Sequence, residues 1–121
     1  MKTARPRSAA HRMFRAFSDP TRVRILSLLS RGERCVGDLV QVLDVPQPTA
    51  SRHLAYLRRS GIVQTRESGL WVYYRLAPAQ TAFHRKLLEC LAACFTEIPE
   101  VKGDARRLAR LGESGRGCCP S

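Results

Sequence analysis

Lysine, acidic residues and long apolar runs are scarce in this sequence, and each scarcity narrows the class of protein. The 121 residues contain 21 lysines and arginines against 10 aspartates and glutamates, which gives a formal net charge of +11. Only Lys2, Lys86 and Lys102 are lysines, so the positive charge is almost entirely arginine, whose planar fork suits phosphates and guanine edges. The balance predicts a polyanionic partner, with nucleic acid first and an anionic membrane surface second.

Membrane and secretory segments are also missing from the pattern. No stretch approaches the roughly 18 apolar residues that are needed to cross a bilayer, and residues 1–10 are basic without the apolar core of a secretory signal. We therefore expect a cytoplasmic protein whose length corresponds to one compact domain. The five cysteines lack the spacing of a disulfide scaffold, so they would be free thiols in that reducing compartment.

The signatures of common enzymes do not occur. A thiol-based phosphatase needs an arginine six residues after its cysteine, but Gln41 stands at that distance from Cys35, and Thr96 stands at that distance from Cys90. There is no Walker-type phosphate loop, no zinc-protease helix and no nucleophile triad. We expect no catalytic activity and no organic cofactor.

Short helices and one hairpin account for most of the chain. Asp19 or Ser18 provides a helix cap, Pro20 suits the first helical position, and Gly32 provides a left-handed stop. Two runs rich in valine, threonine and aromatic residues flank Ser68 and Gly69, which is the signal of a β-hairpin. Apolar spacing and breakers predict helices at residues 11–17, 20–31, 36–43, 47–59 and 78–98, and strands at residues 62–67 and 71–76.

This order of elements is that of a winged helix-turn-helix, a mainly α fold with a β-hairpin wing (α+β). We divide the chain into a flexible basic arm (residues 1–10), the winged helix-turn-helix domain (11–98) and a flexible, glycine-rich tail (99–121). In such a motif the second helix, here residues 47–59, enters the major groove of DNA. The polar side of this helix and the hairpin supply the candidate DNA-contacting residues, which are Gln47, Thr49, Ser51, Arg52, His53 and Arg66.

Three stretches of the sequence, residues 17–26, 47–54 and 69–76, closely resemble the ArsR/SmtB family of bacterial metal-responsive repressors. The resemblance implies a homodimer whose first and last helices form the interface, and a repressor that leaves operator DNA when a ligand binds. The interface residues implied in this way are Phe14, Phe17, Leu87, Leu91 and Phe95. One departure is Pro46, which stands where many members have a serine or threonine cap, so the reading helix is expected to begin differently.

The positions of the cysteines differ from those in many arsenical repressors, which carry a cysteine pair at the start of the first helix of the helix-turn-helix. Those members have Glu-Leu-Cys-Val-Cys-Asp-Leu, whereas residues 33–39 here read Glu-Arg-Cys-Val-Gly-Asp-Leu, so only Cys35 is retained and Gly37 replaces the second cysteine. The sequence resembles instead the branch with cysteines in the last helix and the tail. Cys90 and Cys94 are four residues apart, which places them on one face of a helix.

The chemistry of thiolates selects the ligand. Trivalent arsenic and antimony bind three thiolates in a pyramid, whereas Zn²⁺ prefers four ligands with histidine or carboxylate among them, and the chain has only three histidines. We therefore expect As(III) or Sb(III) as inducer, bound by the vicinal pair Cys118-Cys119 together with Cys90 or Cys94 of the same or the other subunit. Cys35 is interpreted first as a small core residue and second as a ligand. A methylated trivalent arsenical needs two thiolates, so the vicinal pair alone would suffice for it.

Other functions also fit parts of the sequence. A repressor of the same fold could sense Zn²⁺, Cd²⁺ or Pb²⁺, and a redox-sensing DNA binder could use a cysteine pair without a metal. A nucleoid-type architectural protein would share the basic charge but would show little sequence preference. The expected partners are double-stranded operator DNA, a second copy of the chain, and arsenite, antimonite or methylarsenite.

Overall fold

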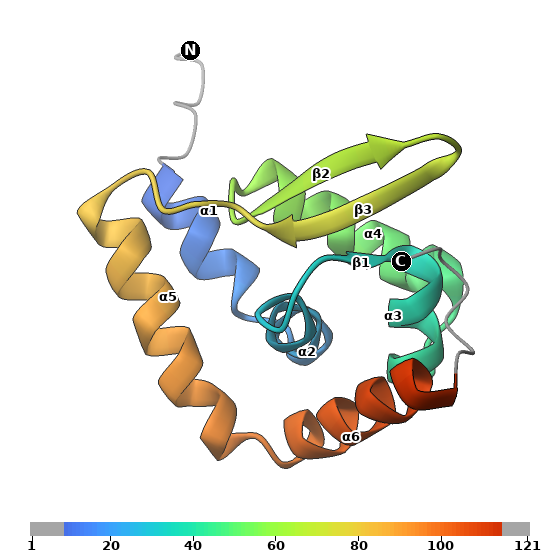
Figure 1. The fold of residues 1–121 in the computed structure, drawn as a ribbon. Helices are drawn as coiled ribbons and strands as arrows, with labels where there is room; N and C mark the ends of the chain where they lie inside the picture. The colour runs from blue at the N-terminus through green and yellow to red at the C-terminus, as the bar shows by residue number, and fades with distance from the viewer. Residues whose placement is uncertain (1–8, 115–121) are drawn as a thin grey trace.

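The fold is built around α2, which crosses the centre of the domain with the other helices around it (Figure 1). The structure, a computed structural model, describes residues 9–114. In this part of the chain the helices are α1 (Ala9–Ala16), α2 (Pro20–Leu29), α3 (Val36–Leu43), α4 (Gln47–Arg59), α5 (Ala82–Cys94) and α6 (Pro99–Ser114), with a 3-10 turn at Phe95–Glu97. The strands are β1 (Arg34–Cys35), β2 (Val63–Ser68) and β3 (Trp71–Leu76). The expected mainly α fold with a β-hairpin wing is confirmed.

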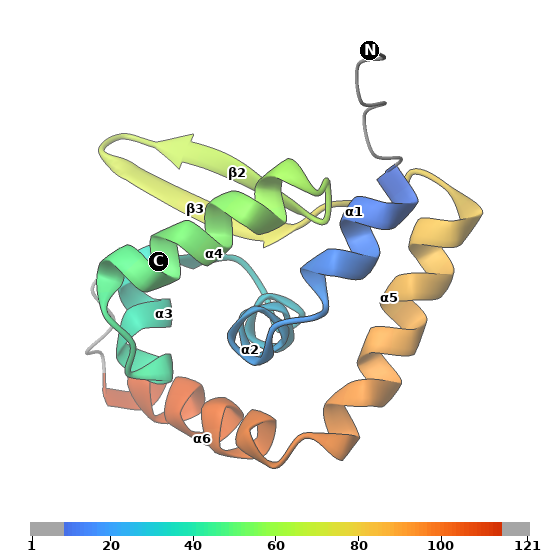
Figure 2. The ribbon, with the colours of Figure 1, turned by 180° about the vertical axis from the view of Figure 1, so that it is seen from behind.

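The central position of α2 explains why its sequence is apolar on most sides. Figures 1 and 2 show α1, α5, α6 and α3 arranged around it, and a helix enclosed in this way cannot keep a wide polar face. Its buried apolar side chains are Val23, Ile25, Leu26, Leu28 and Leu29. The Asp19 carboxylate caps the helix by accepting hydrogen bonds from the backbone N–H groups of Thr21 (2.8 Å) and Arg22 (3.1 Å), which confirms the predicted cap.

The turn between α3 and α4 sets the start of the reading helix. Asp44 ends α3 in the left-handed region (φ 55°), and Pro46 occupies the N-cap position of α4 with an extended backbone. Pro46 makes no side-chain cap, but its carbonyl accepts a hydrogen bond from the backbone N–H of Ala50 at 3.1 Å. The helix therefore begins at Gln47 and ends at Arg59, as the sequence predicts. Its buried side consists of Ala50, Leu54 and Leu57.

The wing contains one strand more than the sequence predicts. β2 and β3 form the expected hairpin, and Gly69 at its turn has a φ of 61°, which favours glycine. β1 adds to the other edge of β3, with Arg34 opposite Tyr74 and Cys35 opposite Tyr73, so the sheet order is β1-β3-β2. A strand of two residues shows no alternation of apolar and polar residues, and the sequence therefore could not reveal it.

Two helices begin at positions that differ from the sequence-based expectation. α1 begins at Ala9, inside the segment expected to be a flexible arm, and α5 begins at Ala82 rather than near Pro78. Thr81 caps α5, because its hydroxyl accepts a hydrogen bond from the backbone N–H of His84 at 3.0 Å. None of the helices within residues 9–114 is long and apolar enough to cross a membrane.

Residues 99–114 form the helix α6, so the expectation of a flexible tail from residue 99 is wrong for this segment. α6 packs against α2 and α3. Its inward side carries Val101, Asp104, Leu108 and Leu111 at helical spacing. The charged Asp104 in this inward row, together with Gly103 and Gly112 elsewhere in the helix, hid the helix from the apolar pattern. The rest of the expected tail, residues 115–121, lies outside the described residues.

A buried carboxylate fastens α6 to the core. The Asp104 side chain is fully buried, and both of its oxygens accept hydrogen bonds from Arg24 of α2, at 2.9 and 2.8 Å. Arg107 donates to the same carboxylate at 2.5 Å and to the backbone carbonyl of Val42 in α3 at 2.8 Å. The hydrogen bond to Asp104 raises the pKa of the Arg24 guanidinium above its usual range. One carboxylate thus joins three helices.

We predict that Asp104→Ala destabilises the domain. The change leaves two arginines without their shared partner, and removing one member of a buried ion pair costs several kcal/mol. Because Arg24 and Arg107 keep some contact with water, we expect a loss of about 3 kcal/mol in the free energy of unfolding. Denaturant titration measures this loss. The control Glu100→Gln changes an exposed carboxylate on the same helix and should shift stability by no more than about 0.5 kcal/mol. Equal stability of the two variants would contradict the role given to Asp104.

Candidate DNA-binding surface and cysteine placement

The outer side of α4 is a basic and polar surface. Gln47, Ser51 and Arg52 are exposed, and Thr49 is half-buried beside them. The helix carries three arginines and no acidic residue, with Arg58 and Arg59 in its last turn. Hydrogen-bonding side chains and positive charge on one exposed helix are the features that read base edges and hold phosphates. Three of the six predicted DNA-contacting residues, Gln47, Ser51 and Arg52, are therefore accessible on α4.

His53 differs from its neighbours because its ring faces α2. Its Nδ1 lies 3.4 Å from Nη1 of Arg22, and its Nε2 lies 3.8 Å from the Asp19 carboxylate. Desolvation lowers the pKa of His53 despite the opposing effect of the Asp19 carboxylate, so the environment favours the uncharged ring. In this position the His53 side chain contacts α2 and its N-cap and helps to hold α4 against them.

Arg22 is a supporting residue that the sequence reasoning missed. Its guanidinium lies 4.2 Å from the centre of the Tyr56 ring on α4. The same side chain donates hydrogen bonds to the backbone carbonyls of Ala16 (2.9 Å) and Arg15 (3.0 Å) at the end of α1. Arg22 therefore ties α1, α2 and α4 together. Nothing in its spacing distinguished it from the other surface arginines.

Arg66 on the wing has a partner within the chain. Its guanidinium donates two hydrogen bonds to Glu33, at 2.9 and 2.6 Å, and stacks 4.7 Å from the centre of the Tyr73 ring. The pair lowers the pKa of the Glu33 carboxyl. Arg66 would have to exchange this carboxylate for a phosphate to contact DNA. The pair also links the wing to the segment that leads into β1.

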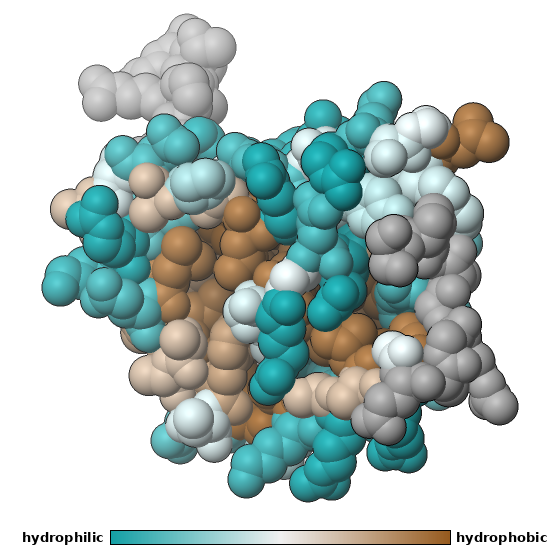
Figure 3. All heavy atoms as spheres, viewed as in Figure 1, coloured by the Kyte–Doolittle hydropathy of each residue, from teal (hydrophilic) through white to brown (hydrophobic). Residues whose placement is uncertain are grey.

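The predicted interface residues divide into two groups. Leu87 and Leu91 on α5 are buried within the subunit, so in the isolated chain they belong to its core. Phe14 of α1 is 57% exposed, and its ring makes an edge contact with Phe83 of α5 at a centroid distance of 5.2 Å. Figure 3 shows apolar side chains over the face between α5 and the centre of the molecule. Phe14 is thus the most accessible of the five, while Phe17 and Phe95 are half-buried.

The cysteines occupy different parts of the molecule. Cys90 is exposed and Cys94 half-buried in the second half of α5, and both are free thiols. Cys35 is 2% exposed at the junction of β1 and α3, and its sulfur is disulfide-bonded. Cys118 and Cys119 lie outside the described residues. Within residues 9–114, no three side chains of histidine, cysteine, aspartate or glutamate come together in a way that could hold a metal ion.

The fold and the surface of α4 define a DNA-binding protein of the winged helix-turn-helix class. The sequence matches the family model "Bacterial regulatory protein, arsR family" over residues 19–65. It is 44% identical over 104 residues to the arsenical resistance operon repressor of Escherichia coli strain K12, a match that covers 85% of this chain and 87% of that protein. The chain therefore belongs to the arsR family of bacterial regulatory proteins, and it is a transcription regulator rather than an enzyme.

Two further similarities agree with this assignment. The arsenic resistance transcriptional regulator ArsR1 of Pseudomonas putida is 41% identical over 102 residues, which cover 84% of this chain and 78% of that protein. Among solved structures, the homodimeric winged helix-turn-helix DNA-binding domain of Mb0332 from Mycobacterium bovis superposes with a TM-score of 0.61. The identity to that domain is 30%, and the superposition covers 74% of this chain and 82% of that one.

We predict that Arg52→Ala weakens operator binding by about 1–3 kcal/mol, because an exposed arginine on the reading helix can make two hydrogen bonds to a guanine. Arg66→Ala should cost less, since Glu33 already neutralises that side chain. Fluorescence anisotropy with a labelled operator duplex measures both affinities. Arg106→Ala removes an equal charge from the exposed side of α6 and serves as the control. An Arg52 variant that binds DNA no more weakly than this control would contradict the assignment.

Proposed function

We propose that this chain is the repressor of an arsenic-resistance operon and that it leaves operator DNA when trivalent arsenic or antimony binds its cysteine thiolates. The observation that carries the proposal is the similarity to two regulators named for arsenic resistance over about 85% of the chain. The cysteine content supplies the chemistry, because soft thiolates favour such ions over Ca²⁺ or Mg²⁺.

The DNA-bound form is a homodimer in this proposal. The related Mycobacterium bovis domain is homodimeric. In this chain the exposed Phe14 of α1 is the candidate contact with the second subunit. Two α4 helices would then enter successive major grooves about 34 Å apart on an inverted repeat. Because the net charge is +11, we expect operator affinity to fall steeply as salt rises.

The inducer site contains the vicinal pair Cys118-Cys119 and one further thiol. Arsenous acid exchanges its three hydroxyl groups for three thiolates, each hydroxyl leaves as water with one thiol proton, and arsenic stays trivalent. A ligand that requires deprotonated thiols binds less well at acid pH. Release from DNA requires that the arsenic-bound dimer binds the operator more weakly than the arsenic-free dimer does. The coupling free energy between two such binding sites is typically about 1–3 kcal/mol.

A thiol-based redox sensor is the second candidate, and one observation favours it. The sulfur of Cys35 is disulfide-bonded, although the residue is almost fully buried. In a redox sensor a peroxide would oxidise two thiols to a disulfide and would itself be reduced to water. Counting free thiols after exposure to peroxide or to arsenite separates the two functions, because arsenite masks thiols without oxidising them.

We predict that arsenite and antimonite release the reduced wild-type dimer from its operator, whereas Zn²⁺ does not. The double variant Cys118→Ala/Cys119→Ala should bind the operator normally in the absence of arsenic and should stay bound when arsenite is added. Anisotropy of a labelled duplex reports both states. If the double variant still dissociates, the tail pair is not part of the site. If the wild type itself stays bound at saturating arsenite, the proposed function is wrong.

A further inference from the structure

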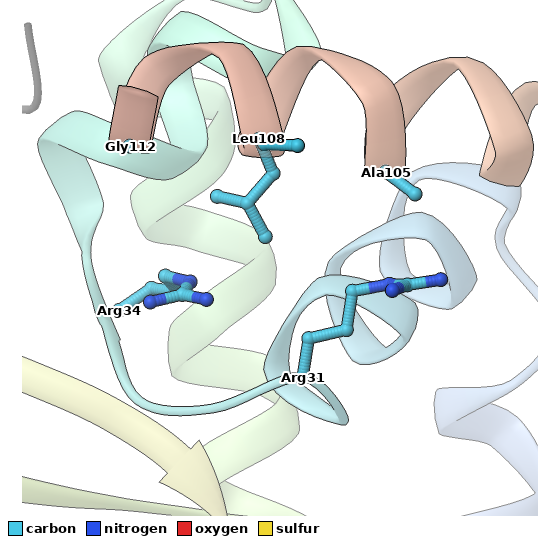
Figure 4. Close-up of a pocket in the computed structure, with 6 residues that line it drawn as sticks. Arg31, Arg34, Ala105, Leu108 and Gly112 are labelled. Atoms are coloured by element: carbon cyan, nitrogen blue, oxygen red, sulfur yellow. The ribbon is translucent and has the colours of Figure 1, made fainter. Parts of the chain in front are cut away.

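A cavity between α6 and the segment that joins α2 to β1 contains two arginine side chains. It has a volume of about 490 Å³, which lies within the usual range for small-molecule sites. Figure 4 shows Arg31 and Arg34 on one side of this space and α6 on the other. We call it the arginine cavity, and within residues 9–114 it is lined by Arg31, Arg34, Ala105, Leu108, Ala109 and Gly112, of which none is acidic.

The guanidinium group of Arg34 is held in place but is not fully hydrogen-bonded. Its Nη1 donates to the backbone carbonyl of Glu33 at 3.1 Å, and its Nη2 lies over Gly32, 3.7 Å from the position that a Cβ there would take. Its Nε–H is shielded from water and has no hydrogen-bond partner among the described residues. Because nearly all buried donors in proteins are paired, this Nε–H marks a place for an acceptor that residues 9–114 do not supply.

Arg31 is a second cation without a partner in the described part of the chain. It is exposed just after the end of α2, and within residues 9–114 its side chain makes no hydrogen bond or ion pair. Two acidic residues adjoin the lining residues in sequence, but both are used elsewhere. Glu33 accepts hydrogen bonds from Arg66 of the wing, and Asp104 is fully buried in the contact between α6 and α2.

Positive charge continues beyond the arginine cavity along α6. An adjoining cavity of about 620 Å³ shares Arg31 and Ala105 with it and adds the exposed cations Lys102 and Arg106. Its lining residues within the described chain also include no acidic side chain. Cations that gather along a hollowed surface raise the local concentration of anions. This side of α6 therefore attracts anions, and the arginine cavity offers them an unpaired donor.

The walls of the arginine cavity determine which kind of anion uses it best. Two guanidinium groups can donate several charge-assisted hydrogen bonds to one oxyanionic group. The opposite wall is apolar, and Figure 4 shows Leu108 and Ala105 directed from α6 toward the arginines. An inorganic anion would contact the arginines but would leave this wall facing water. An anion with a small apolar group contacts both walls and gains from the burial.

We infer that the arginine cavity binds a small organic anion, whose oxyanionic group accepts hydrogen bonds from Arg34 and Arg31 and whose apolar part lies against Leu108 and Ala105. The site contains no cysteine, so it goes beyond the proposed arsenic response and does not depend on it. Arg34 belongs to β1. A ligand held there would join α6 to the strand that lies between the wing and α3.

The test uses the reduced full-length protein and two probes of similar charge. Phenylphosphonate has an oxyanionic group and an apolar ring, whereas inorganic phosphate has the oxyanionic group alone. Isothermal titration calorimetry gives both affinities. NMR spectra that resolve the arginine Nε–H groups locate the bound probe, and the Arg34 signal is identified by its absence from the variant Arg34→Lys. The midpoint of thermal unfolding shows whether each variant is folded.

The expected result depends on the geometry of the arginines rather than on their charge. Phenylphosphonate should shift the Arg34 Nε–H signal saturably and should bind about fivefold or more tightly than inorganic phosphate. Arg34→Lys keeps the charge but lacks the Nε–H and the planar fork, so it should weaken phenylphosphonate binding about fivefold or more. Arg110→Gln removes an exposed charge of α6 outside both cavities and should match the wild type within about twofold.

Three outcomes would overturn the inference. They are equal binding of the two probes, wild-type affinity in Arg34→Lys, and an affinity that falls with Arg110→Gln as much as with Arg34→Lys, which would reveal a general attraction to positive charge. If Arg34→Lys does not fold, the exposed Arg31→Lys decides the same question, because it also keeps the charge and loses the fork. Release of the operator by arsenite is measured separately, so failure of this site leaves the proposed function standing.

Discussion

The buried carboxylate of Asp104 holds the arrangement together. Without its hydrogen bonds to Arg24 and Arg107, α6 would dock on α2 and α3 through Val101, Leu108 and Leu111 and through the hydrogen bond from Arg107 to Val42. A buried charge is tolerated only when it is paired and hydrogen-bonded, so the position of Asp104 fixes the rotation of α6 as well as its contact. The position of α6 against α2 and α3 therefore follows from this one interaction.

Most of the fold could be predicted because its elements carry local signals. Asp19 and Pro20 marked the start of α2, Pro46 marked the start of α4, and Gly69 marked the hairpin turn, and each signal corresponds to the observed structure. α6 was missed because its inward row is interrupted by a charge whose partners lie 80 and 3 residues away in sequence. Local apolar periodicity cannot represent a side chain that is buried by a distant partner.

The candidate site was predictable at the level of residue type but not of environment. The sequence placed His53 and Arg66 among the DNA-contacting residues, and the structure shows that one packs on Arg22 and the other pairs with Glu33. Both partners are distant in sequence, as is Tyr73, which pairs with Cys35 across the wing. Cys90 and Cys94 lie on one helix, as their spacing predicted, and their role as ligands stays a prediction.

The short strand β1 connects the two elements that would contact DNA. Cys35 of β1 lies opposite Tyr73 in the wing and also occupies the N-cap position of α3, and α3 leads directly into the turn before α4. Only two residue pairs hold β1 at the edge of the sheet, and the ion pair between Arg66 and Glu33 adds a second link between the wing and the segment that precedes β1. Because β1 joins the wing to α3, a small shift of this strand would change the spacing of the two elements that must fit the DNA grooves together.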